Sequence, residues 1–336
     1  MSNQAAVLKE EQADLTIEER PIPEAGPSDV VVKNHALATN PVDWKMQHFG
    51  VFLEKYPAIL GSDVSGVVDS VGSDVKHFRK GDRVTGFADA LLSKDPQNGA
   101  FQQYSLVKEC ALAKIPDSMS FEEGSILPMS VATAAVGIFL SMGIPRPPAK
   151  QQGGFLVWGA SSSVGTGAVQ IAASLGYTVY GVCSPHHSAM VKKLGAHETF
   201  DRKSFYVVKD IIKSLKASNH QVVAAYDAIS ERGSAQKCVE ILEALGGGKL
   251  CLTLPYPEDA GKPAGVEIVQ TYAAKICIDK EFGHWLFNEW LAKSLEDKTF
   301  VPSPTIETID GGIQSVQKAL DLHAKGLSGK KLVITL

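Results

Sequence analysis

The feature that most constrains the fold is a run of small residues between an apolar segment and a helical pattern. Residues 155–158 read Phe-Leu-Val-Trp, residues 159–167 read Gly-Ala-Ser-Ser-Ser-Val-Gly-Thr-Gly, and apolar residues at helical spacing follow. This pattern predicts a strand, a tight turn and a helix start, an arrangement that binds a dinucleotide pyrophosphate on backbone N–H groups. The glycines depart from the G-x-G-x-x-G spacing, and turns of glycine and serine also occur for purely structural reasons.

The next predicted strand, residues 178–183, ends about twenty residues beyond the turn, where such a site meets the adenosine ribose. No Asp or Glu stands between Thr178 and Val191 to bind the ribose 2′-OH of NAD. A 2′-phosphate would instead find hydrogen-bond donors there. These are Ser184, His186, His187, Lys192 and Lys193. We therefore predict NADPH rather than NADH, with a solvated loop and an exposed helix face as the alternative interpretation.

Length and composition indicate an ordinary globular protein of two domains. The chain has 336 residues, of which 44% are hydrophobic and 21% charged, and this length is long for one core. A net charge of −4 without a basic stripe argues against nucleic-acid binding. The N-terminus lacks the pattern of a signal peptide, and no window reaches about twenty apolar residues. We expect a cytoplasmic protein that does not bind a membrane.

The cysteines predict neither a disulfide framework nor a metal site. There are five of them, widely separated, and no C-x-x-C pair is present. The nearest candidate for a metal cluster is His186-His187, but adjacent side chains diverge on most backbones. Structural zinc is therefore not expected.

The two halves of the chain have different patterns. Short alternating runs near 30–34, 66–72, 82–87 and 101–107 predict a small, largely antiparallel barrel. An apolar helical run extends from 121 to 143. Strands then alternate with helices, which predicts a six-stranded parallel sheet. Its strands are expected near 155–158, 178–183, 198–200, 222–227, 248–254 and 276–279. The last strand, 331–336, is expected to return to the barrel.

This order of elements resembles the medium-chain dehydrogenase/reductase superfamily. The resemblance implies a GroES-like β-barrel catalytic domain at 1–125 and 286–336 and a Rossmann, doubly wound NADPH-binding domain at 126–285. Several segments look like those of the zinc-free quinone and enoyl reductase branches, namely 38–45, 60–66, 81–84, 99–101 and 326–331. The chain is most similar to fungal trans-acting enoyl reductases, because Asn-Pro-x-Asp-x-Lys-Met and Cys-Ser-Pro-His recur in that group.

Zinc-dependent members of the superfamily bind their catalytic metal through Cys, His and Cys. By motif position those places hold Asn40, Ser62 and, less securely, Met129 here. None of these side chains supplies a thiolate or an imidazole. The resemblance therefore implies no catalytic metal.

Reduction of an activated C=C bond needs a hydride at the β-carbon, a counter-charge for the enolate and a proton at the α-carbon. The resemblance places the 42–45 loop against the cofactor. Lys45 is then a catalytic candidate, for electrostatic assistance or for holding the nicotinamide ribose and phosphate, and otherwise an exposed lysine on a short helix. Tyr56 is a weaker candidate for the proton donor and could equally pack in the barrel. For Asp43, the alternative to a cofactor contact is that it merely caps the helix.

The resemblance also implies further site residues, each of which could instead serve packing. Ser162 and Ser163 replace two glycines of the commoner motif, although serine hydroxyls can still donate to phosphate. Arg202 stands where the family often has Tyr near the adenosine. Besides Lys45, the expected cofactor contacts are Val42, Asp43, Thr133, Ser161, Ser162, Ser163, Val164, Ser184, Pro185, His186, His187, Arg202, Leu254, Gly329 and Lys330. The expected substrate contacts are Val131, Thr133, Ala134 and Ile138.

The expected function is a zinc-independent, NADPH-dependent reductase of α,β-unsaturated carbonyls, namely a stand-alone enoyl reductase of polyketide or secondary metabolism. Its substrate would be a small molecule or a carrier-bound enoyl chain, with a polyketide synthase as a possible partner and a monomer or homodimer as the assembly. A quinone or aldehyde reductase of detoxification is the first alternative. A non-catalytic NADPH-binding protein is the second.

Overall fold

The computed structural model describes residues 2–93, 95, 98–218 and 222–336, and the chain passes between two units at two points. Unit 1 comprises the chain up to Met129 and again from Ala274, and unit 2 is Ser130–Ala273. The sequence placed these boundaries at 125/126 and 285/286. The second boundary differs because helices α9 (Lys275–Ile278) and α10 (Lys280–His284) belong to unit 1. There the Cys110 thiol donates to the Ile276 carbonyl at 3.7 Å.

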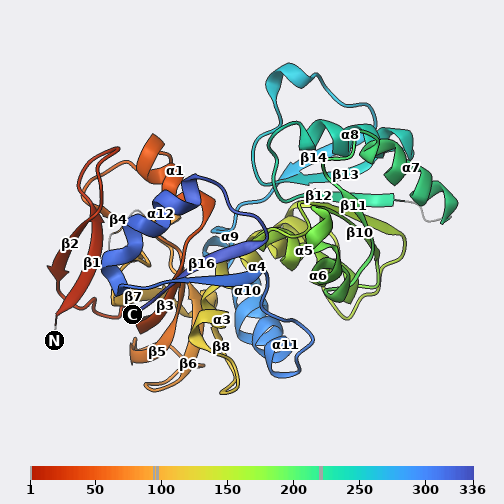
Figure 1. The fold of residues 1–336 in the computed structure, drawn as a ribbon. Helices are drawn as coiled ribbons and strands as arrows, with labels where there is room; N and C mark the ends of the chain where they lie inside the picture. The colour runs from red at the N-terminus through yellow and green to blue at the C-terminus, as the bar shows by residue number, and fades with distance from the viewer. Residues whose placement is uncertain (1, 94, 96–97, 219–221) are drawn as a thin grey trace. The chain divides into compact units, whose positions relative to one another are not determined.

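Unit 2 contains one six-stranded sheet in which every neighbouring pair is parallel. The strand order is β11-β10-β9-β12-β13-β14. Figure 1 labels β10 to β14 of this sheet. The order reverses between β9 and β12, as it does in a doubly wound fold. The predicted fold class is therefore confirmed. The strands are β9 (Gly154–Trp158), β10 (Thr178–Cys183), β11 (Ala196–Asp201), β12 (Val222–Asp227), β13 (Gly248–Leu252) and β14 (Val266–Gln270).

Helices connect these strands and cover the sheet. α7 and α8 pack through Ile211 and Leu242 against Leu156, Tyr180 and Leu250 of the strands. Because side chains alternate along a strand, residues 155 and 157 of β9 point to the opposite face, where α5 contacts the sheet. The helices are α5 (Ser163–Ser174), α6 (Ser188–Lys193), α7 (Val207–Ala217) and α8 (Ser234–Ala244).

The predicted sixth strand at 276–279 is wrong. Residues 275–278 form α9, in which Ile276 is fully buried, and the sixth strand is β14. A run of four residues with two buried apolar side chains suits a short helix as well as a strand, so pattern alone does not separate them. The sequence analysis does not predict β14, because its alternating apolar residues follow a loop of prolines and charged residues.

Unit 1 is built on a seven-stranded sheet and a three-stranded sheet. The larger has the order β15-β16-β3-β5-β6-β8, with β7 also paired to β3, and the smaller has the order β2-β1-β4. β16 lies antiparallel to β3, so the predicted return of the last strand is confirmed. The strands are β1 (Asn3–Leu8), β2 (Thr16–Arg20), β3 (Asp29–Ala38), β4 (Ala58–Ile59), β5 (Asp63–Val71), β6 (Arg83–Phe87), β7 (Tyr104–Lys108), β8 (Leu112–Lys114), β15 (Thr305–Ile309) and β16 (Lys330–Thr335).

The apolar helical run predicted from 121 is broken into pieces. α3 (Phe121–Ser125) is followed by α4 (Pro128–Ala135), which continues as a π-helical turn at Val136–Ser141. Together, 121–141 are long and apolar enough to cross a membrane, which the sequence analysis expected of no segment, and 89% of the apolar window is buried inside the protein. That burial is typical of a core helix. The remaining helices of unit 1 are α1 (Pro41–Phe49), α2 (Ala90–Ser93), α11 (Ala292–Glu296) and α12 (Val316–Ala324), with a second π-helical turn at Trp285–Leu291.

Candidate functional site

The turn between β9 and α5 has the geometry of an anion-binding helix start. Gly159 adopts a φ of +73°, and Ser162 caps α5 by accepting a hydrogen bond from the Gly165 N–H at 3.0 Å. A Cβ on Gly165 would lie 2.1 Å from the Gly159 carbonyl oxygen, so only glycine lets the helix approach the strand end. The Ser163 Oγ is buried and has no hydrogen-bond partner among the described residues. An unpaired hydroxyl at a helix N-terminus fits the phosphate of a dinucleotide.

Two predicted cofactor residues come together beside this turn. The Arg202 Nε donates to the Ser184 Oγ at 3.0 Å, and the Arg202 N–H donates to the Cys183 carbonyl at 3.1 Å. Ser184 is buried while Arg202 is exposed. The guanidinium therefore lies at the carboxyl end of β10 with donors left for an anion.

The histidines that follow differ from the sequence expectation. The rings of His186 and His187 lie 4.0 Å apart between centroids instead of diverging. Burial, His186 and Arg202 all lower the pKa of His187, which favours a neutral ring. Pro185 and His186 are exposed.

A carboxylate also lies at the carboxyl end of β10, although the loop that follows β10 contains none. Asp201 pairs in register with Cys183 across β10 and β11. Its Oδ1 accepts a hydrogen bond from the Lys203 N–H at 2.9 Å. The pairing of β11 with β10 brings Asp201 to this position, so the sequence around β10 alone does not reveal it.

In unit 1, α1 starts with a reciprocal cap. The Asn40 N–H donates to the Asp43 Oδ2 at 2.7 Å, and the Asn40 side chain caps the Asp43 N–H in return. Asp43 is fully buried, and this burial raises the pKa of its carboxyl to about 8 despite the hydrogen bond from Asn40. The acid is therefore protonated at neutral pH. Its Oδ1 has no partner among the described residues.

The two catalytic candidates lie along and after the same helix. Lys45 is half-buried, with its Nζ 5.7 Å from the centroid of the Trp44 ring. Tyr56 is half-buried, and burial together with Glu11 raises the pKa of its hydroxyl. A raised pKa makes Tyr56 a weaker acid.

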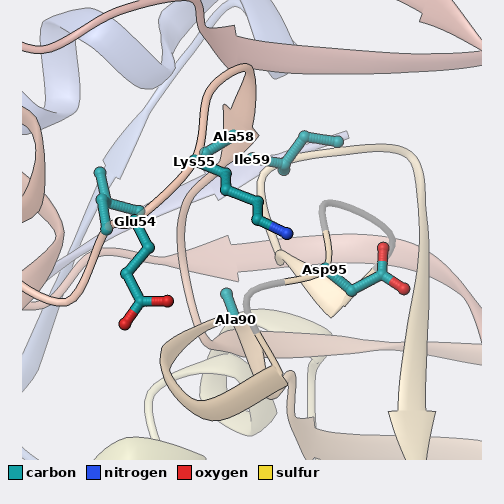
Figure 2. Close-up of a pocket in the computed structure, with 7 residues that line it drawn as sticks. Glu54, Lys55, Ala58, Ile59, Ala90 and Asp95 are labelled. Atoms are coloured by element: carbon teal, nitrogen blue, oxygen red, sulfur yellow. The ribbon is translucent and has the colours of Figure 1, made fainter.

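A shallow hollow lies in the segment around Tyr56. It has an apolar floor that includes Ala58, Ile59 and Ala90, and Lys55 reaches over it beside Asp95 (Figure 2). The hollow opens to solvent. Its remaining lining residues are Leu53 and Glu54.

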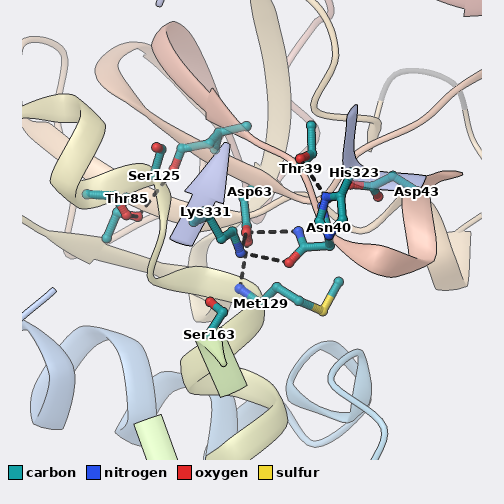
Figure 3. Close-up of polar contacts among 12 residues, drawn as sticks. Thr39, Asn40, Asp43, Asp63, Thr85, Ser125, Met129, Ser163, His323 and Lys331 are labelled. Carbon is teal, nitrogen blue, oxygen red and sulfur yellow. Dashed lines mark hydrogen bonds and ion pairs between the residues drawn. The ribbon is translucent and has the colours of Figure 1, made fainter. Parts of the chain in front are cut away.

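A buried cluster centred on Asp63 was missed by the sequence analysis (Figure 3). The Lys331 Nζ donates to the Asp63 Oδ2 and to the Asn40 Oδ1, both at 2.7 Å. The Asn40 Nδ2 donates to the same Asp63 Oδ2 at 2.9 Å, and the Met129 N–H donates to the Asp63 Oδ1 at 2.6 Å. The side chains of Asp63 and Lys331 are 0% and 3% exposed. Both residues stand within segments that carried the family resemblance, but nothing in the sequence indicates that they pair.

This cluster holds two of the three residues that the family resemblance places at the metal-ligand positions of zinc-dependent members. Asn40 and Met129 both donate to Asp63, and the Ser62 Oγ is buried with no hydrogen-bond partner among the described residues. Within the described ranges, no group of three or more His, Cys, Asp or Glu residues is arranged to hold a metal ion. Lys331 supplies the positive charge of the cluster.

The other predicted residues differ in their burial and in their hydrogen-bond partners. The Thr133 carbonyl accepts from the Tyr226 hydroxyl at 2.8 Å and from the Thr271 Oγ1 at 2.7 Å. Lys330 is exposed and paired with Glu307. Three of the remaining residues are fully buried, namely Val131, Ala134 and Ile138. The others are half-buried, namely Val42, Ser161, Val164, Leu254 and Gly329.

Comparison with known proteins agrees with this architecture. The family described as the alcohol dehydrogenase GroES-like domain matches residues 26–117. The chain is 36% identical to the trans-enoyl reductase tndF of Aspergillus flavipes over 99% of both chains. It is 34% identical to the dehydrogenase orsE of Emericella nidulans over 100% of this chain and 99% of that one.

Among solved structures, an alcohol dehydrogenase superfamily protein from Novosphingobium aromaticivorans shares the fold. It matches with a TM-score of 0.82 and 22% identity over 99% of both chains. Members of this family generally bind nicotinamide cofactors. Since full-length relatives exceed 30% identity and the fold agrees, the chain belongs to the medium-chain dehydrogenase/reductase superfamily of oxidoreductases.

Proposed function

We propose that this chain is a zinc-independent, NADPH-dependent enoyl reductase that reduces the C=C bond of α,β-unsaturated carbonyls. The observation that carries the proposal is the chemistry of the donor set at Asn40, Ser62 and Met129. It offers no thiolate or imidazole for a Lewis-acid metal. Asp63 accepts from the Asn40 side-chain amide and from the Met129 N–H, and Lys331 donates to the Asn40 Oδ1. The similarity to a trans-enoyl reductase supports the choice of substrate class.

In this proposal the residues of unit 2 hold the cofactor. The helix start at Ser162, the unpaired Ser163 hydroxyl and nearby backbone N–H groups bind the pyrophosphate. Arg202, held by Ser184, pairs with the 2′-phosphate. NADPH supplies a hydride to the β-carbon of the enoyl substrate when bound.

The residues of unit 1 act on charge and protons. The Lys45 ammonium provides a counter-charge for the enolate oxygen or holds the nicotinamide ribose. Tyr56 is the candidate that returns a proton to the α-carbon, although its raised pKa favours retention of the proton. We therefore expect Tyr56→Phe to lower kcat less than Lys45→Met does.

The central test measures NADPH oxidation with an enoyl thioester, a quinone and an aldehyde, each also with NADH. We expect oxidation of NADPH with the enoyl thioester and a higher KM for NADH. Activity with quinones alone would contradict the proposal in favour of a quinone reductase. NADPH binding without oxidation of any substrate would instead support a non-catalytic binding protein.

Cofactor preference has its own test at Arg202. Arg202→Met is expected to raise the KM for NADPH about tenfold, which corresponds to about 1.4 kcal/mol, because one charge-assisted phosphate contact is lost. The KM for NADH should not change. Lys203→Met is the matched control, since Lys203 is an exposed neighbour. Equal effects on both cofactors would show that Arg202 does not contact the 2′-phosphate.

We also propose a carrier-bound enoyl chain as the substrate, a polyketide synthase as the partner and a cytoplasmic location. The similarity to the trans-enoyl reductase of Aspergillus flavipes motivates the first two. Comparing kcat/KM for a carrier-bound and a free thioester tests the substrate form. A preference for the free thioester would remove the reason for a synthase partner. Sedimentation of the purified chain decides between a monomer and a homodimer.

A further inference from the structure

We propose that Asp63 and Lys331 are positioning residues that hold the starts of two helices, α1 and α4, in register for the reaction. This inference rests on the proposed function, because these helices carry Lys45 and Thr133. Neither Asp63 nor Lys331 is assigned to substrate or cofactor contact. They act through the atoms to which they are bonded.

The first connection leads from Lys331 to α1. Lys331 on β16 and Asp63 on β5 both bond the Asn40 carboxamide, one at its oxygen and one at its nitrogen. Asn40 is the N-cap of α1. The orientation of the first helical turn follows from the orientation of its cap, because the cap residue supplies partners for the free N–H groups of that turn. Lys45 lies just over one turn from Asn40.

The second connection leads from Asp63 to α4. The N–H groups of the first helical turn have no partner within the helix. Asp63 accepts the N–H of Met129, the second residue of α4, at 2.6 Å, and a carboxylate at this end is favoured by the helix dipole. Met129 is the last residue of unit 1, so this bond anchors the helix on the unit 1 side of the crossing.

The energetics favour a positioning role over a stabilising one. Moving two charges out of water costs about as much as their attraction returns, and apolar residues of similar size often stabilise a fold equally well. A buried pair does, however, restrict geometry, because each charge must keep its partners. Both Asp63 oxygens are occupied here, one by Lys331 and Asn40 and the other by Met129. One carboxylate therefore couples the starts of two helices.

The test uses the double variant D63N/K331M in the full-length protein. It buries no unpaired charge, but Asn has one acceptor oxygen where Asp63 has two. We therefore expect one helix start to lose its anchor. Amide hydrogen exchange should become faster at the start of α1 or of α4, and kcat with NADPH and an enoyl thioester should fall about tenfold. The Kd for NADPH should change less than kcat does, since the pyrophosphate turn is in unit 2.

Ser105→Ala is the matched control for stability. Ser105 is buried in the same unit and accepts a hydrogen bond from Asn34 at 2.8 Å, away from both helices. It should lower the melting temperature without reducing kcat. A purely structural role for the pair predicts the same pattern in D63N/K331M as in the control, namely a lower melting temperature with an unchanged kcat.

The outcomes separate the two proposals. Wild-type exchange rates at both helix starts in the double variant would overturn the positioning role. Faster exchange with an unchanged kcat would overturn it as well. An inactive wild-type protein would instead refute the proposed function, and the exchange rates would still decide whether Asp63 and Lys331 anchor the helices.

Discussion

At the scale of single residues, burial shifts the pKa values of several groups in the polar interior of unit 1. Asp43 is fully buried beside the Asp63 cluster, and its pKa is raised to about 8. His323, hydrogen-bonded to Thr39 at 2.8 Å, has a pKa lowered to about 4 by burial and by Lys331. A buried acid is therefore held neutral and a buried base is also held neutral. The same interior holds the ion pair of Lys331 with Asp63 at 2.7 Å.

The raised pKa of Asp43 predicts how the free energy of unfolding depends on pH. An unfolded Asp loses its proton near pH 4, whereas folded Asp43 keeps its proton up to about pH 8. The folded state therefore binds more protons, and stability falls as pH rises, by up to about 1.4 kcal/mol per pH unit. His323 acts only below pH 6.5, and buried Asp89, with a pKa of about 6, acts mainly below pH 6. Burial also raises the pKa of Asp227 in unit 2, so the contribution of Asp43 between pH 6.5 and 8 is measured by comparison with Asp43→Asn.

Asp43→Asn should reduce this dependence, because a carboxamide can still accept the Asn40 N–H without ionising. Urea midpoints at pH 6.5 and 8 measure the effect. We expect the wild-type midpoint to fall more steeply across this window than that of Asp43→Asn does. Parallel lines for the two proteins would mean that Asp43 ionises at a normal pKa.

At the scale of elements, the β9–α5 turn shows what a sequence can predict. The apolar strand, the small residues and the helical pattern are all local, and the structure forms the strand, the turn and the helix where the pattern placed them. β14 and α9 show the opposite case. Their short apolar patterns are ambiguous until the rest of the sheet decides which segment lies at its edge.

The turn yields a prediction with a control on the same helix. Gly165→Ala places a Cβ 2.1 Å from the Gly159 carbonyl oxygen and should push α5 away from β9, which weakens NADPH binding and lowers the melting temperature. Gly167→Ala meets its nearest atoms only at 3.4 Å and should be tolerated. Thermal melts with and without NADPH check both variants. Normal cofactor affinity in Gly165→Ala would contradict a close approach of helix and strand.

Ser162 allows a second measurement at the same turn. Ser162→Ala removes the cap that accepts the Gly165 N–H at 3.0 Å and should cost about 1 kcal/mol of stability. Ser163→Ala removes a hydroxyl without a partner among the described residues, so it should cost less stability. If the Ser163 hydroxyl binds phosphate, Ser163→Ala should nevertheless raise the Kd for NADPH. An unchanged Kd would leave Ser163 with no role in binding.

At the scale of the whole molecule, the two ends of the chain belong to the same unit. The last strand, β16, lies between β15 and β3 in the large sheet of unit 1. The sequence predicted this return because an apolar strand must pair somewhere. It could not predict the pairing of Asp63 with Lys331, which lie 268 residues apart. Such contacts depend on the register between distant strands, for which one sequence holds no local signal.

Truncation tests the role of β16 in unit 1. Removal of residues 330–336 takes away β16 and Lys331 and should prevent unit 1 from folding, because two strands lose their partner. Limited proteolysis should then digest unit 1 while the continuous sheet of unit 2 resists. Leu336→Ser is the control, since Leu336 is exposed and lies beyond β16. A truncated chain with a wild-type melting curve would show that β16 is dispensable.

Unit 2 is one uninterrupted segment, and unit 1 is the chain on both sides of it. For protein engineering, residues 130–273 form one continuous segment that can be replaced as a whole. A chimera could take the nicotinamide-binding segment of a relative with another coenzyme preference and keep every atom of the Asp63 cluster, because its members lie at or before Met129 and at Lys331. Under the proposed function, the residues that bind the 2′-phosphate and those that handle protons would then lie in separate segments of the chain.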